Sequence, residues 1–177
     1  MADPMADEHL KLPVLTENCE SCAAICCVAY PFDGDEDFAI VKEADTPCPN
    51  LGPDFRCTIH KDLKIKGFTG CTAYSCAGAG QRITRELFPD ETWHDDPDLI
   101  YHMAYALRVI RPIHEALLLL SEAAKLPIPP AALAEGRALM AAMCPEEDTS
   151  IHDFEEPEVQ EALADVPRYL QSLAGYL

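Results

Sequence analysis

Eight of the nine cysteines in this 177-residue chain lie between residues 19 and 76, and the first four form a dense Cys-x-x-Cys-x-x-x-Cys-Cys run. The predicted metal ligands are Cys19, Cys22, Cys26, Cys27, Cys48, Cys57, Cys71 and Cys76. A structural zinc ion takes about four protein ligands, and iron–sulfur clusters are also held by cysteine thiolates. The block can therefore fill two four-coordinate sites, or one cluster with spare ligands, and we expect its folding to depend on metal.

Two other interpretations of the cysteines stay open. Buried free cysteines can act as small apolar side chains. A redox-active dithiol is the second alternative, but a thioredoxin-like Cys-x-x-Cys sits in a βαβ setting, which this sequence does not contain. The acidic N-terminus lacks an apolar signal segment, which predicts a cytoplasmic protein with reduced cysteines. Soft sulfur ligands then favour zinc or iron, including an iron–sulfur cluster, as the cofactor.

Three further residues need a separate assessment as ligands. His60 follows Cys57 by three residues, a spacing that zinc sites use, so His60 is a ninth candidate ligand and equally a surface histidine. His114 lies in an apolar helical pattern and is expected in the core. Cys144 stands alone before a proline and is not expected to bind metal.

The first cysteines lie in a segment with two structural interpretations. Thr16 can cap a helix over residues 16–30, which would place Cys19, Cys22 and Cys26 on one face, with Cys27 about 100° away from Cys26. The alternative is a tight loop wrapped around the metal. Further along, residues 38–42 predict a short strand, and residues 77–80 predict a flexible glycine-containing link.

The second half of the chain changes to helical periodicity. Apolar residues recur at helical spacing from residue 97 onward and predict three amphipathic helices, the second over 131–143 and the third over 157–173. Pro112 is expected to kink or split the first helix, and Pro167 to kink the third. The predicted fold is therefore mainly α: a small irregular cysteine-rich metal-binding unit, with room for one short hairpin, packed on about three amphipathic helices.

This pattern predicts three segments: a flexible tail over residues 1–15, the cysteine-rich unit over 16–93 and the helical unit over 94–177. The chain has 13 basic and 31 acidic residues, a net charge of −18. Such a surface repels nucleic acid and anionic membranes, so the expected partners are a metal ion and a protein. The longest apolar run is too short to cross a bilayer. Hydrolytic and nucleotide-binding motifs are absent, which leaves enzymatic activity uncertain.

The cysteine spacing is similar to that of a known family. The Cys-x-x-Cys-x-x-x-Cys-Cys run, Cys48-Pro-Asn-Leu51, Cys57-Thr-Ile-His60 and Cys71-Thr-Ala-Tyr74 together resemble the YkgJ-type CxxCxxxCC family. The family is described as zinc- or iron-chelating, and the resemblance implies the same chemistry for residues 19–76. Some relatives of this type are linked to iron–sulfur-dependent methylation of protein lysines, but the rest of such an enzyme is not visible in this chain.

A closer likeness extends beyond the cysteines. The stretches at 54–60, 67–71, 78–82 and 111–120 look like the N-terminal region of actinobacterial pentapeptide-repeat proteins. This chain has no pentapeptide array after residue 130, so a function carried by the repeats, such as a DNA-mimicking solenoid, is not implied.

We therefore predict a cytosolic metal-binding protein with a binding or interaction role. One alternative is a metal- or cluster-dependent enzyme that modifies a protein or peptide, suggested by the excess of thiolates and by His60, Tyr74 and Tyr101. Another is a thiol redox sensor or a metal-storage protein, suggested by the adjacent Cys26 and Cys27.

Overall fold

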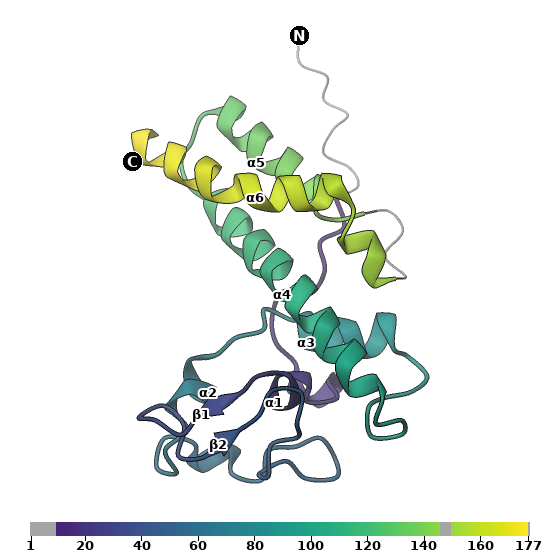
Figure 1. Ribbon diagram of the computed structural model, residues 1–177. Helices are drawn as coiled ribbons and strands as arrows, with labels where there is room; N and C mark the ends of the chain where they lie inside the picture. Colours follow the sequence, from purple (N-terminus) through teal and green to yellow (C-terminus); the bar gives the residue numbers. More distant parts are fainter. Residues whose placement is uncertain (1–9, 146–149, 177) are drawn as a thin grey trace. The chain divides into compact units, whose positions relative to one another are not determined.

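The computed structural model describes residues 10–145 and 150–176 and is mainly helical, with a two-stranded antiparallel hairpin in its cysteine-rich part (Figure 1). The predicted fold class, including the short hairpin, is confirmed. The chain divides into two compact units. One runs from Thr16 to Arg111; the other joins the segment that ends at Leu15 to the segment that begins at Pro112. Of the predicted tail, residues 1–9 lie outside the described residues, and residues 10–15 form no helix or strand.

The cysteine-rich unit consists of short elements joined by turns. In chain order they are the 3-10 turn η1 (Cys19–Ser21), α1 (Ile25–Ala29), β1 (Phe32–Asp33), β2 (Val41–Lys42), the 3-10 turn η2 (His60–Asp62), α2 (Thr69–Ala73), α3 (Ala79–Arg82) and the π-helical turn η3 (Ile83–Leu87). Phe32 pairs with Lys42 and Asp33 with Val41. The boundary between the two compact units falls between Arg111 and Pro112, inside α4 (Leu99–Ala123). The boundary predicted from the sequence was after residue 93.

The helix predicted to begin at Thr16 is wrong. The chain instead makes the turn η1, capped by the Asn18 side chain, which accepts a hydrogen bond from the Glu20 N–H at 3.0 Å. Cys22 is then extended, and Ala24 takes the left-handed conformation with φ of 53°, so a continuous helix is interrupted before α1 begins. Cys19, Cys22 and Cys26 therefore do not share one helical face, and the tight-loop interpretation describes this backbone.

The flexible link predicted at residues 77–80 is also wrong. All four of these residues are buried, and α3 begins at Ala79. Gly78, with φ of 81°, takes the left-handed conformation just before the helix, which glycine adopts without a steric penalty. The small side chains here allow close packing rather than mobility.

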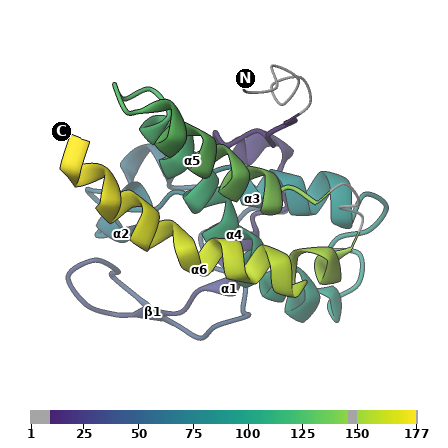
Figure 2. The ribbon, with the colours of Figure 1, turned by 90° about the horizontal axis from the view of Figure 1, so that it is seen from above.

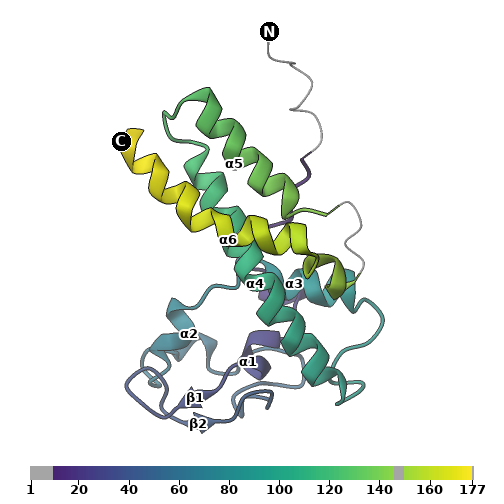
Figure 3. The same cartoon turned by 45° about the horizontal axis from the view of Figure 1, so that its top comes forward.

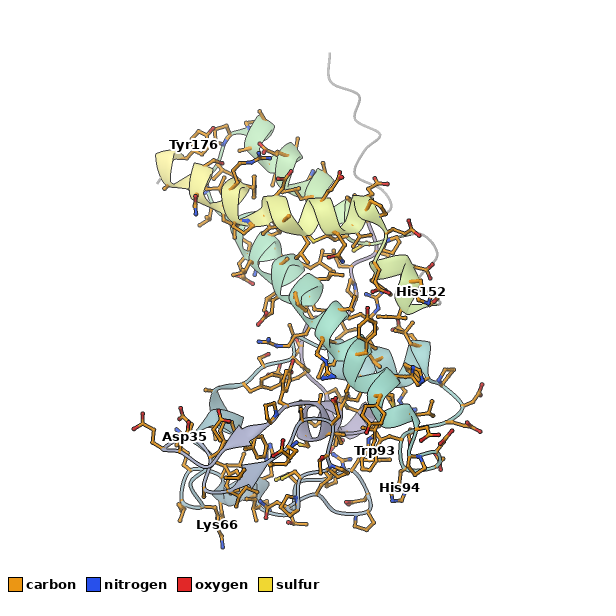
Figure 4. All side chains as sticks on the ribbon, viewed as in Figure 1. Asp35, Lys66, Trp93, His94, His152 and Tyr176 are labelled. Atoms are coloured by element: carbon orange, nitrogen blue, oxygen red, sulfur yellow. The ribbon has the colours of Figure 1, made fainter. Side chains whose placement is uncertain are left out.

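Long-range contacts hold this unit together. The Trp93 indole N–H donates to the Ala23 carbonyl at 2.7 Å, and the Arg108 guanidinium donates to both carboxylate oxygens of Asp45 at 2.9 Å. Trp93 and His94 lie next to each other, with ring centroids 5.8 Å apart (Figure 4). These contacts fix the loops around α1, which carries two of the predicted ligands.

The helical unit contains the second part of α4, α5 (Pro130–Ala142), the 3-10 turn η4 (Ile151–Phe154), α6 (Pro157–Ser172) and the 3-10 turn η5 (Leu173–Tyr176). Helices α5 and α6 lie side by side (Figures 2 and 3), and the Tyr169 hydroxyl joins them by donating to the Ala132 carbonyl at 3.1 Å. The Ser150 and Asp153 side chains form a reciprocal capping box at η4.

Neither internal proline ends its helix. Helix α4 runs unbroken through Pro112, so the expectation that Pro112 splits it is wrong, and α6 likewise continues through Pro167. A proline inside a helix costs about 3 kcal/mol, but α4 buries Leu107, Ile110, Ile113 and Leu117 almost completely, and that burial outweighs the cost. His114 is also fully buried in this helix, as predicted. Within the ranges that the structure describes, none of the helices combines the length and apolar character needed for a membrane span.

Candidate metal centre

One group of cysteines gathers beside α3. Gly80 leaves room there for two sulfur atoms: a Cβ added to it would lie 2.8 Å from the Cys22 sulfur and 3.8 Å from the Cys76 sulfur. Burial raises the pKa of the Cys22 thiol to about 11, and Cys76 is the neighbouring thiol that adds to this shift. Burial also raises the pKa of Cys19, with Cys76 and then Cys27 as the thiols that add to the shift. Cys19, Cys22 and Cys76 therefore occupy one neighbourhood.

Side chains from α3 and the turn after it hold the first cysteines in this place. The Gln81 amide donates to the Thr16 carbonyl at 2.8 Å and accepts from the Asn18 N–H. The Thr84 hydroxyl accepts from the Ala23 N–H at 3.0 Å and donates to the Gly80 carbonyl at 2.9 Å. Gln81 and Thr84 position the candidate ligands but are not ligands themselves. They were not identified from the sequence because their partners are about 60 residues away in the chain.

A second group forms around the hairpin. The Cys48 N–H donates to the Cys27 carbonyl at 3.0 Å, and Cys57 forms an isolated antiparallel bridge with Leu51. Cys71 lies in α2. Burial raises the pKa of Cys71 to about 11, and the thiols of Cys27, Cys48 and Cys57 add to it. Cys48, Cys57 and Cys71 all pack against one buried aromatic and aliphatic cluster, made of Phe32, Leu63 and Phe68.

Helix α1 carries the adjacent pair Cys26 and Cys27, one for each group. A hydrogen bond to Cys27 and then burial raise the pKa of Cys26 well above its usual value, with Cys22 and Cys76 adding to the shift. The pKa of Cys27 is lowered, because the Cys26 thiol donates to it and the Lys42 ammonium attracts its charge, although burial opposes both. Cys27 is therefore the member of the pair that favours the thiolate.

Lys42 is a buried cation beside the second group and was not identified from the sequence. Its ammonium donates to the carbonyls of Val28, Glu43 and Thr46 at 3.0, 3.0 and 2.8 Å, and it lies 5.0 Å from the centre of the Phe32 ring. Burial lowers the pKa of Lys42, while the charges of Cys48 and Cys27 act in the opposite direction. A fixed positive charge at this position partly balances the negative charge of a group of thiolates. The signal in the sequence was weak: a lysine that directly follows the apolar residues Ile40 and Val41.

Tyr74 places a buried hydroxyl near the first group. Within the part of the chain that the structure describes, its oxygen has no hydrogen-bond partner, although the Tyr30 ring lies edge-on at 5.4 Å and the Arg111 guanidinium lies 5.0 Å from the ring centre. Burial and then the neighbouring Tyr30 side chain raise the pKa of Tyr74, and the charges of Cys26 and Cys76 contribute, so the hydroxyl keeps its proton. An unsatisfied buried donor costs free energy, and a bound anionic group such as a metal thiolate would satisfy it.

The remaining predicted residues lie apart from the two groups. His60 is exposed at the start of η2, and Tyr101 is 65% exposed on α4. Cys144 belongs to the helical unit. Whether His60 binds metal stays a prediction.

The cysteines of each group are neighbours but do not converge on a point. Among residues 10–145 and 150–176, no three His, Cys, Asp or Glu side chains are arranged to hold a metal ion as they stand. The eight cysteines between residues 19 and 76 are free thiols. Protonated thiols are not drawn to a common point, and a metal ion supplies that attraction by displacing their protons. The donor chemistry, the space over Gly80 and the unsatisfied Tyr74 hydroxyl all fit a metal–thiolate group.

The raised thiol pKa values predict how the stability of the metal-free protein depends on pH. The pKa of Cys22 rises from 9.0 to about 11 on folding, so the folded chain holds its proton more tightly than the unfolded chain. The free energy of unfolding should then be highest below pH 9 and fall as the pH rises towards 11, by on the order of 2 kcal/mol for this thiol. Urea denaturation of reduced, metal-free protein across this range measures the effect. Cys22→Ala should show a weaker dependence; equal slopes for the two proteins would contradict the assignment.

The comparisons with known proteins identify one uncharacterised relative. The chain is 40% identical over 114 residues to "Uncharacterized protein YybG" of Bacillus subtilis (strain 168). The match covers 64% of this chain and 41% of that protein, so the chain spans less than half the length of the relative it matches. No family model matches the chain, and no solved structure matches it.

Proposed function

We propose that this protein is a metal–thiolate protein whose clustered cysteines bind zinc or an iron–sulfur cluster, and that the loaded unit has a binding or interaction role. The observation that carries the proposal is the grouping of eight free thiols within one compact unit, Thr16–Arg111. The resemblance of the cysteine spacing to the CxxCxxxCC family, described as zinc- or iron-chelating, supports the same chemistry. A metal would draw the thiols of a group together and replace the protons that they carry without it.

Small size and short elements also support a structural contribution from metal. Helices α1, α2 and α3 have five, five and four residues, and each strand has two. Helices this short are not stable by themselves in water. Metal–sulfur bonds are a common substitute for a large apolar core in such units. That the protein also meets a protein partner stays a prediction from the sequence.

Anaerobic purification without chelator, followed by elemental analysis and a visible absorption spectrum, tests the proposal. We expect stoichiometric metal: a colourless protein with zinc, or a brown protein with iron and acid-labile sulfide. Cys144→Ser is the matched control, because it removes the one cysteine that lies outside the block and should leave the metal content unchanged. A wild-type protein that is folded and carries no metal would overturn the proposal.

Redox sensing is a second candidate, favoured by one observation. The Cys26 thiol is hydrogen-bonded to Cys27, whose pKa is lowered, and a thiolate is the form of cysteine that reacts with peroxide. If the protein senses peroxide, mild oxidant should convert pairs of thiols to disulfides, with the peroxide reduced to water, and should release metal. Cys27→Ser should slow this release, whereas an unchanged release rate would argue against the sensor.

A further inference from the structure

We propose that the eight cysteines form two separate four-sulfur sites that exchange metal at different rates. The first site consists of Cys19, Cys22, Cys26 and Cys76, and the second of Cys27, Cys48, Cys57 and Cys71. The inference rests on the proposed function and adds the grouping of the ligands and a division of labour between the two sites.

Helix α1 lies where the two sites meet. Cys26 and Cys27 are adjacent in this helix, so their side chains leave its axis about 100° apart, and the Cys26 thiol reaches back to Cys27 with a hydrogen bond. The helix lies between α2, which carries Cys71, and α3, which follows Cys76 (Figures 1 and 3). Two adjacent cysteines in such a position supply one sulfur to each side more readily than two sulfurs to one ion.

The first site is organised around Gly80. The sulfurs of Cys22 and Cys76 both lie over this residue, so any side chain at position 80 would occupy the space between them. The peptide N–H of Ala79 donates to the Cys76 carbonyl at 2.9 Å, which fixes the approach of Cys76 to the helix. The unsatisfied hydroxyl of Tyr74 is two residues before Cys76 and supplies a donor for a metal-bound sulfur.

The second site is organised around the hairpin and its apolar cluster. Three of its four cysteines pack against Phe32, Leu63 and Phe68, each of which is at most 8% exposed. The fourth, Cys27, is joined to Cys48 through the backbone hydrogen bond from the Cys48 N–H. Buried Lys42 lies beside this group and is anchored by three carbonyls, so its charge stays in place. An apolar shell and a fixed cation both favour a closed, slowly exchanging metal thiolate.

The first site contains the one exposed ligand. Among the eight cysteines only Cys19 is exposed, as are the four residues at 16–18 and 20 around it, whereas the other three cysteines of the first site and all four of the second are partly buried. An exposed sulfur can be displaced from a metal by an incoming chelator or thiol, which makes exchange at that ion faster. The geometry therefore makes the first site the one that can give up or accept metal, and the second the one that maintains the fold.

Native mass spectrometry of the loaded protein tests the grouping. We expect two metal centres in the wild-type chain and one in each of Cys22→Ser and Cys71→Ser. Gly80→Ala should reduce occupancy of the first centre alone, because the added methyl group meets the Cys22 sulfur; Gly175→Ala is its control, since a Cβ there meets nothing within 4 Å. Loss of all metal from both cysteine variants would show one shared cluster and overturn the inference. A wild-type chain without metal would instead overturn the proposed function.

Competition with a coloured chelator tests the difference in rate. Wild-type protein should release half of its metal in a fast phase and half in a slow phase, with rates about tenfold or more apart, a difference of about 1.4 kcal/mol in activation free energy. Only the fast phase should remain in Cys71→Ser, and only the slow phase in Cys22→Ser. A single rate for both centres, or the opposite assignment of phases, would overturn the proposed division of labour.

Discussion

Removing metal from the loaded protein is expected to unfold the cysteine-rich unit, and residues 19–76 first. Structural zinc contributes on the order of 10 kcal/mol to such small units, which is comparable to the whole stability of a typical domain. The part of the unit around the second site has little to replace it: its hairpin strands have two residues each, and its apolar cluster has three buried members. Hydrogen exchange with mass spectrometry, before and after chelation under reducing conditions, measures the loss of protection.

The helical unit provides an internal control for that experiment. Helices α5 and α6 lie in the other compact unit and contain no cysteine, so their peptides should stay protected. Unchanged protection of peptides from residues 19–76 after complete metal removal would contradict the structural role. Loss of protection in every peptide at once would show that the two units unfold together.

Replacing Lys42 by methionine is expected to have the second large effect. The substitution removes the donor that three carbonyls share and leaves the acceptors of Val28, Glu43 and Thr46 without this partner. Loss of a buried charged donor costs on the order of 3 kcal/mol, and loss of its charge also disfavours thiolates at Cys27 and Cys48. Urea denaturation of the loaded protein measures the fall in the free energy of unfolding.

Lys66→Met is the matched control for this variant. Lys66 is exposed and points away from the ribbon (Figure 4), so its loss should change the free energy of unfolding by less than about 0.5 kcal/mol. If Lys42→Met lowered the free energy of unfolding as little as Lys66→Met does, the buried ammonium would have no structural role at the second site.

The elements that local patterns specify were predictable from the sequence. Helical periodicity correctly indicated α5 and α6 to within about two residues at each end. Of the strand predicted over residues 38–42, only Val41–Lys42 forms β2. Pro112 shows where a local rule fails. Of the kink or break predicted there, the break is wrong, because burial along one face of α4 outweighs the local penalty. The kinks predicted at Pro112 and Pro167 stay predictions.

The path of the first cysteines could not be predicted, because distant residues determine it. The segment from Thr16 to Ala23 is held by Gln81 and Thr84, at separations of 61 to 65 residues, and a helix propensity carries no information about them. The burial of Lys42 likewise depends on carbonyls brought together by the fold. The identity of the eight candidate ligands was available from spacing alone, whereas their division into two neighbourhoods required the structure.

X-ray absorption spectroscopy at the metal edge reports directly which atoms surround the metal. For zinc, we expect a first shell of four sulfur atoms at about 2.3 Å. For iron, we expect sulfur neighbours together with the iron–iron distance of a cluster. A first shell dominated by nitrogen or oxygen would contradict the claim that the clustered cysteines hold the metal.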